Sequence, residues 1–280
     1  MKNILIPTDF SENSWNALNY TIELFKHETV NFYLLHIGDI NQTDVVGNSF
    51  ELTNNKIKIA TIKLKLNGLM NRIDNLPKRQ KHHFFAMQEY GNFISNIRKI
   101  VAKKKIDLIA VGTKGASGLK TSIVGSNTGE IITKIVCNIL AVPEKASICV
   151  PKHLVFPTDY NIFFSHPILE SITGVLQLSK SKLQVLNVVR NNVNLTPDQE
   201  YNKNYFKEYL EETFENAYSF HNTADSNIKT GIQKFVTANK ADMVVMVAKN
   251  LNFLQNLLFH STIKQVSLHT TVPLLILHEK

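Results

Sequence analysis

Short apolar runs alternate with amphipathic segments along the first half of the chain. The runs have the length of buried strands, and in the segments between them apolar residues recur every three or four positions, as in helices. Ser11 stands where it can cap the first helix, which carries Trp15 and Leu18 at helical spacing. We expect strands at 2–6, 31–37, 83–88, 106–111 and 138–142, and helices at about 14–26, 50–74, 92–104 and 128–136. This alternation predicts an α/β fold, with a parallel sheet covered by helices on both faces.

The order of the five strands follows from the handedness of their connections. Right-handed crossovers restrict the topology. If the sheet grows outward from the first strand to the third and then returns for the fourth and fifth, the order is 3-2-1-4-5. The first and fourth strands then flank the switch point, where such sheets bind ligands beyond their carboxyl ends. Pro7, Thr8 and Asp9 follow the first strand, and Gly112 ends the fourth, so we expect these residues to meet.

The chain contains this unit twice. Residues 4–10 return as 154–160, an offset of 150, whereas 97–107 match 232–242 at an offset of 135 that continues without a gap. The second copy is therefore 15 residues shorter, and the loss lies between its second strand and its third helix. We place the units at 1–146 and 147–280, each a five-stranded domain with the same strand order.

Two equal units are expected to pack on each other as an internal pseudo-dimer. The last strand of each unit, at 138–142 and 273–277, is the exposed-edge candidate for that pairing. The sequence leaves open whether two whole chains then form a homodimer.

The composition is that of a globular protein, with 44% hydrophobic and 19% charged residues. No apolar run is long enough to span a membrane, and the first one meets Pro7 too soon for a signal peptide. Two cysteines, Cys137 and Cys149, cannot form a disulfide scaffold, and we expect Cys137 to lie in the core. These features indicate a cytoplasmic protein.

The net charge of +8 is concentrated in the first unit. Residues 1–145 carry 19 Lys and Arg against 12 Asp and Glu, whereas 146–280 carry 12 against 11. A basic unit favours an anionic partner such as a nucleotide, a nucleic acid or an acidic protein, and a solvated lysine-rich surface is the alternative. Nucleic acid is not favoured, because the lysines lack interleaved stacking aromatics.

Glycines follow the fourth strand of the first unit at a regular spacing. Gly112 and Gly115 are followed, after nine residues, by Gly125, Ser126 and Asn127. A residue without Cβ lets the backbone approach a ligand closely, and N–H groups at the start of a helix can bind phosphate. Glycines that only end helices and strands are the alternative explanation. The full spacing after a buried strand favours a phosphate cradle.

With these residues the chain resembles the universal stress protein (UspA) family. The likeness rests on Ile6-Pro7-Thr8-Asp9, Leu35-His36-Ile37, the G-2x-G-9x-G-S motif and the run from Cys137 to Pro143, and it covers both copies. It implies two Rossmann-like domains of the adenine nucleotide alpha hydrolase-like kind, and the glycine motif marks the ATP-binding branch of the family.

The resemblance also implies the roles of single residues. Asp9 would meet the ribose and the backbone of Ile37 the adenine, while Gly112 would lie at the ribose. Mg²⁺ would arrive with the ATP, bound mainly to phosphates. The complete set expected to bind the cofactor is Pro7, Thr8, Asp9, Ile37, Gly112, Gly115, Gly125, Ser126 and Asn127. A purely structural role for Asp9, capping the following turn, is the alternative.

The second copy departs from the glycine motif. Its three glycine positions hold Val247, Asn250 and His260, while Ser261 and Asp159 remain. Side chains at these positions should fill the space for phosphate and keep the backbone away from it. We expect a domain that retains the fold but does not bind a nucleotide in this way, with Asp159 as a cap.

The leading hypothesis is a cytoplasmic, ATP-binding regulatory protein of the stress response, whose nucleotide state alters its contacts with a protein partner. There is no P-loop and no G-x-G-x-x-G motif after the first strand. No pair suited to nucleophilic or acid–base catalysis stands out, so we expect at most slow ATP hydrolysis and no catalytic or metal-ligating residue. The alternative is a protein-interaction module of the same fold in which neither copy binds a nucleotide.

Overall fold

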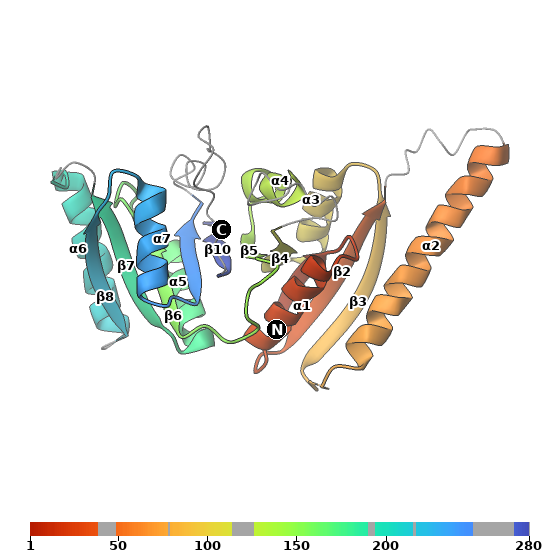
Figure 1. Cartoon of the computed structure of the whole chain (residues 1–280), viewed down its shortest axis with the longest axis horizontal. Helices are drawn as coiled ribbons and strands as arrows, with labels where there is room; N and C mark the ends of the chain where they lie inside the picture. Colours follow the sequence, from red (N-terminus) through yellow and green to blue (C-terminus); the bar gives the residue numbers. More distant parts are fainter. Residues whose placement is uncertain are drawn as a thin grey trace.

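A computed structural model describes residues 1–38, 49–77, 79–113, 126–189, 194–214, 217–248 and 272–279. Within these residues one ten-stranded sheet runs through the molecule in the order β3-β2-β1-β4-β5-β10-β9-β6-β7-β8 (Figure 1). Each half of that sheet has the order 3-2-1-4-5 expected from the sequence. The two Rossmann-like units therefore share a single sheet.

The first unit contains β1 (Lys2–Pro7), α1 (Glu12–Leu24), β2 (Val30–Gly38), α2 (Ser49–Asp74), β3 (His82–Tyr90), α3 (Phe93–Lys104), β4 (Leu108–Gly112), α4 (Ser126–Lys134) and β5 (Asn138–Val142). The second contains β6 (His153–Pro157), α5 (His166–Ser179), β7 (Lys182–Val189), α6 (Pro197–Thr213), β8 (Tyr218–Ala224), α7 (Ile228–Ala238), β9 (Met243–Val247) and β10 (Leu274–Leu277). The loss of length in the second unit falls where it was expected, since α2 has 26 residues and α6 has 17.

The repeat extends to details of the backbone. Phe10 and Tyr160 both take left-handed conformations, with φ of 64° and 56°, in the turn after the first strand of their units. At the opposite end of the sheet, Asp107 accepts the N–H of Asn3 at 2.8 Å and Asp242 accepts the N–H of His153 at 2.9 Å. Each contact holds the residue before the fourth strand beside the first strand of its unit, to which its backbone N–H also donates. Strand β4 begins two residues later than predicted.

Helices cover both faces of the sheet. Apolar residues of α1, α2, α5 and α6 pack in one core cluster, and those of α3, α4 and α7 pack in the other. Cys137 lies in the second cluster with 1% of its surface exposed, as predicted. No helix in the described part of the chain is long and apolar enough to cross a membrane.

The two units join through their last strands. β10 pairs antiparallel with β5, with Leu275 opposite Leu140 and Ile276 opposite Ile139. All four side chains are at most 4% exposed. The N–H of His278 also donates to the side chain of Asn138 at 2.8 Å. This is the edge pairing expected from the sequence, and it makes the chain an internal pseudo-dimer.

Candidate functional site

The switch point of the first unit lies between β1 and β4. These strands are parallel neighbours, with Ile4 opposite Leu108 and Leu5 opposite Ile109. After β1 the chain enters α1 on one face of the sheet, and after β4 it leads to α4 on the other face (Figure 1). The carboxyl ends of two neighbouring strands thus diverge to opposite faces, the arrangement at which parallel sheets bind ligands.

The turn after β1 is held by Thr8, which is 8% exposed. Its N–H donates to the carbonyl of Leu35 at 2.8 Å, and its hydroxyl accepts the N–H of Phe10 at 3.0 Å. His36 Nδ1 lies 2.8 Å from the Thr8 carbonyl, so this nitrogen carries the proton and donates it. Residues of β2 therefore fix the conformation of the turn, and His36 has a structural role in it.

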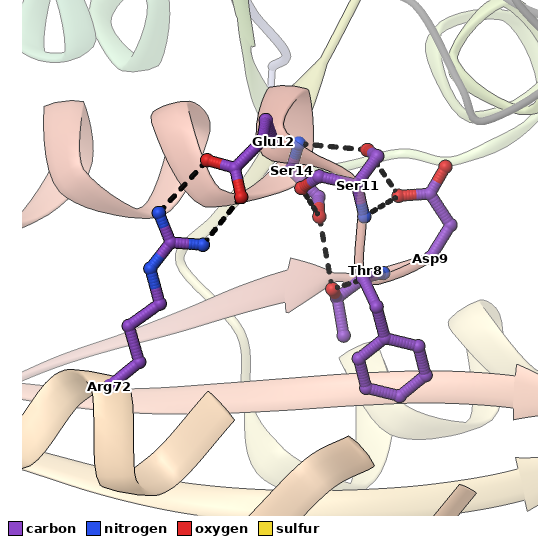
Figure 2. A network of polar contacts seen from close by, with 7 residues as sticks. Thr8, Asp9, Ser11, Glu12, Ser14 and Arg72 are labelled. Carbon is purple, nitrogen blue, oxygen red and sulfur yellow. Dashed lines mark hydrogen bonds and ion pairs between the residues drawn. The ribbon is translucent and has the colours of Figure 1, made fainter. Parts of the chain in front are cut away.

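Asp9 closes the turn that precedes α1, the helix whose N-cap is Ser11. Its Oδ1 accepts the backbone N–H of Ser11 at 3.0 Å and the Ser11 hydroxyl at 2.6 Å, and Ser11 Oγ in turn accepts the N–H of Ser14 at 3.2 Å (Figure 2). Asp159 makes the corresponding contact to the N–H of Asn161 at 3.1 Å. The capping role is therefore present in both units and is independent of the glycine motif. Asp9 is nevertheless exposed at the switch point.

Strand β2 extends past the end of β1. The Leu35 carbonyl faces β1, because it accepts the N–H of Thr8. Alternate residues of a strand direct their backbone groups to the same side, so the N–H and C=O of Ile37 also face that side. Since β1 has turned away by then, these groups border the switch point. This is the backbone that the family resemblance assigns to adenine.

Gly112 connects the two sides of the site. The buried hydroxyl of Thr128, in the first turn of α4, donates to the Gly112 carbonyl at 2.8 Å. A Cβ on Gly112 would lie only 2.6 Å from the side chain of Asn13, at the start of α1. The glycine therefore permits α1 to pack against β4, a structural reason beside the predicted role in binding. The hydrogen bond from Thr128 brings together the two ends of the segment 113–127.

The predicted set of binding residues is only partly described. Gly115 and Gly125 lie outside the described residues. Ser126 begins α4, and Asn127 follows it in the first turn. The structure thus brings Asp9, Ile37 and Gly112 to one edge of the sheet, and α4 starts at the carboxyl end of β4.

Several contacts at the site had no signal in the sequence. Arg72 of α2 donates two hydrogen bonds to the carboxylate of Glu12, at 2.7 and 2.9 Å (Figure 2). Its guanidinium also lies 4.0 Å from the centre of the Trp15 ring. These hydrogen bonds lower the pKa of Glu12. Sixty residues separate the two partners, and no periodic pattern relates them. The same holds for the pairs Asn13–Gly112 and Thr128–Gly112.

The corresponding turn of the second unit is held by β7 and, in addition, by helix α6. Asn187 takes the place of His36 and donates to the Thr158 carbonyl at 2.9 Å. Helix α6 adds two contacts, from Gln199 to the carbonyl of Asp159 at 2.8 Å and from Asn202 to that of Tyr160 at 2.9 Å. The turn in this unit is therefore fastened to a covering helix.

Comparison with known proteins gives a consistent result. The model of the universal stress protein family matches residues 1–143 and 175–278. Universal stress protein MJ0531 of Methanocaldococcus jannaschii is 26% identical over 147 residues, covering 51% of this chain and 82% of the relative. Universal stress protein MJ0577 of the same organism is 26% identical over 157 residues, covering 52% and 97%. The crystal structure of a universal stress protein from Archaeoglobus fulgidus superposes on this chain with a TM-score of 0.68 at 15% identity. The superposition covers 99% of this chain and 98% of that one, so the two proteins share a fold over both units.

Proposed function

Because the chain belongs to the universal stress protein family, we propose that it is an ATP-binding regulatory protein whose first unit holds the nucleotide. The observation that carries this proposal is the hydrogen bond from Thr128 to the Gly112 carbonyl at the end of β4. It joins the two ends of the segment that contains the glycine motif, beside the switch point. A short segment closed at its base is suited to directing backbone N–H groups at a phosphate.

Each part of ATP has a group suited to it. The backbone of Ile37 would contact the adenine, and Asp9 and Gly112 would contact the ribose. The phosphates would be held by Gly115, Gly125, Ser126 and Asn127, and Mg²⁺ would be bound through the phosphates. The excess of positive charge in residues 1–145 supports an anionic ligand.

The second unit serves a different purpose in this proposal. Val247 stands at the position of Gly112 and is 6% exposed. Its side chain covers the backbone at the end of β9, whereas the end of β4 has a glycine and no side chain. This unit would complete the sheet through β10 and contribute surface for a protein partner. ATP bound to the first unit would alter contacts with that partner, or with a second copy of the chain, in the cytoplasm during stress, with at most slow hydrolysis.

A double variant tests the ATP site. Gly115→Asn with Gly125→His gives the first unit the side chains that the second unit has at these positions. We expect Mg·ATP to raise the midpoint of thermal unfolding of the unmodified protein and to leave that of the variant unchanged. The matched control is Gly68→Asn, because nothing lies within 4 Å of a Cβ at Gly68. An equal response to Mg·ATP in the double variant and the control would refute the placement of the site.

One observation favours the alternative function, a protein-interaction module without nucleotide. The turn after the first strand has the same hydrogen bonds in both units, although the second lacks the glycines. The turn alone is therefore no indication of ATP. Absence of any response to Mg·ATP in the unmodified protein would favour this alternative.

A further inference from the structure

Two aromatic side chains stack on one face of the sheet, near its edge. Tyr33 of β2 and Phe85 of β3 are register partners, and their ring centroids lie 5.3 Å apart at an angle of 21°. They lie on the face that α3 covers, because Leu35 and Met87, two residues further along each strand, pack in or against the core cluster of α3. Phe85 is nevertheless 45% exposed, and Tyr33 is partly exposed. Strand β3 is the last strand of the described sheet, so no strand of that sheet lies beyond Phe85.

A lysine lies over one ring of this pair. The ammonium group of Lys104, the last residue of α3, is 5.3 Å from the centre of the Tyr33 ring. Lys103 and Lys105 flank it in the chain, and both are exposed. A cation at this distance is attracted to the face of an aromatic ring, and several cations together attract phosphates. Stacked rings and positive charge thus share one surface, the combination with which proteins bind single-stranded nucleic acid.

The second unit shows that the fold does not require these residues. The three corresponding positions hold polar, uncharged residues, namely Gln184, Ser219 and Asn239. The first two correspond through the matching turn-to-strand hydrogen bonds and strand registers of the two units, and the third through the offset of 135. An exposed aromatic pair with a lysine is therefore a property of the first unit and not a requirement of the shared sheet.

We propose that the first unit binds single-stranded nucleic acid on the surface formed by Tyr33, Phe85 and Lys104. A base would stack on the exposed ring of Phe85, and the ammonium groups of Lys104 and its neighbours would contact backbone phosphates. The net charge of residues 1–145, 19 Lys and Arg against 12 Asp and Glu, matches a polyanion. The sequence next to these lysines carries no aromatic residue, but the fold brings two rings to them from two strands.

This surface is separate from the proposed ATP site. Tyr33 is four residues before Ile37 along β2, which corresponds to about 13 Å in a parallel strand. Ile37 borders the switch point at the carboxyl end of the sheet, whereas Lys104 is at the opposite end of α3 from the carboxyl end of β3. The proposal therefore does not depend on ATP binding by the first unit.

Binding of a fluorescently labelled oligouridine strand to the full chain, measured by anisotropy, tests the proposal. Phe85→Ser gives the first unit the residue of the second unit and should weaken binding about fivefold or more, the contribution of one stacked base. The matched control is Phe163→Ser in the second unit, because Phe163 is 47% exposed and stacks on Tyr205 with ring centroids 5.1 Å apart. Equal affinities of the two variants, or no binding by the unmodified chain, would overturn the proposal.

The dependence on salt and on ATP gives a second reading. Lys104→Asn should reduce the slope of log affinity against log salt concentration by about 0.7, the value of one phosphate contact with a single strand. The control Lys182→Asn removes an exposed lysine of β7 and should leave the slope unchanged. The same slope in both variants would overturn the proposal. Saturating Mg·ATP should leave the affinity for oligouridine unchanged, and displacement of the strand by Mg·ATP would also overturn it.

Crosslinking of the unmodified chain decides if a variant does not fold. An oligouridine strand that contains iodouridine attaches on irradiation to aromatic side chains stacked on its bases, and mass spectrometry identifies the modified residue. We expect attachment to Phe85 or Tyr33. The absence of crosslinks at both residues would overturn the proposal.

Discussion

Replacing Thr128 by Val tests whether the contact at the base of the glycine segment matters. The change keeps the shape of the side chain and removes the hydroxyl that donates to the Gly112 carbonyl at 2.8 Å. Thr128 is 6% exposed, so water does not readily replace the lost donor. Leaving a buried acceptor unpaired costs about 1–3 kcal/mol. For a chain of this size we therefore expect the midpoint of thermal unfolding to fall by about 2–4 °C for each kcal/mol.

The same variant should bind ATP more weakly, because without this contact it costs free energy to hold Gly112 and the start of α4 together around the nucleotide. The loss in affinity is at most about tenfold for each 1.4 kcal/mol of that cost. Titration calorimetry with Mg·ATP measures the affinity, and differential scanning calorimetry measures the stability. The control is Thr133→Val in the same helix, whose hydroxyl donates to the Gly129 carbonyl at 2.9 Å within α4. Full ATP affinity in Thr128→Val would show that the contact is irrelevant to binding and refute the reasoning.

Three further predictions concern stability. Gly112→Ala should cost about 1–3 kcal/mol in urea unfolding, because the new Cβ would lie 2.6 Å from Asn13; a neutral result would mean that α1 shifts freely. Burial lowers the pKa of His82, so the unfolded chain binds more protons than the folded one, and stability should fall as pH drops below about 6.5. The variant His82→Gln should show a weaker dependence of stability on pH, and an unchanged pH profile would contradict this prediction. Leu275→Ala at the junction of β5 and β10 should cost about 2–5 kcal/mol of stability and lower the unfolding midpoint of both units together. A lower midpoint for one unit alone would show that the two units unfold independently.

The sequence was most informative where a physical requirement recurs along the chain. A buried parallel strand needs a continuous apolar run, and a covering helix needs an apolar stripe, so both appear as patterns. The repeat then located the two units, and Ser11 was correctly predicted as a cap. The edge strands that join the units were also predicted, because the last strand of each unit has only one neighbour within its own unit.

Contacts between single residues far apart in the chain could not be predicted. Nothing in the sequence relates Thr128 to Gly112 or Arg72 to Glu12, since each contact depends on where two helices happen to pack.

The number of ATP molecules bound per chain tests the central claim most directly. Titration calorimetry of the full chain with Mg·ATP should give one site per chain, because the first unit has the complete glycine motif and the second has Val247, Asn250 and His260 at its glycine positions. A stoichiometry of zero would contradict the proposed function, and a stoichiometry of two would contradict the assignment of the site to the first unit alone.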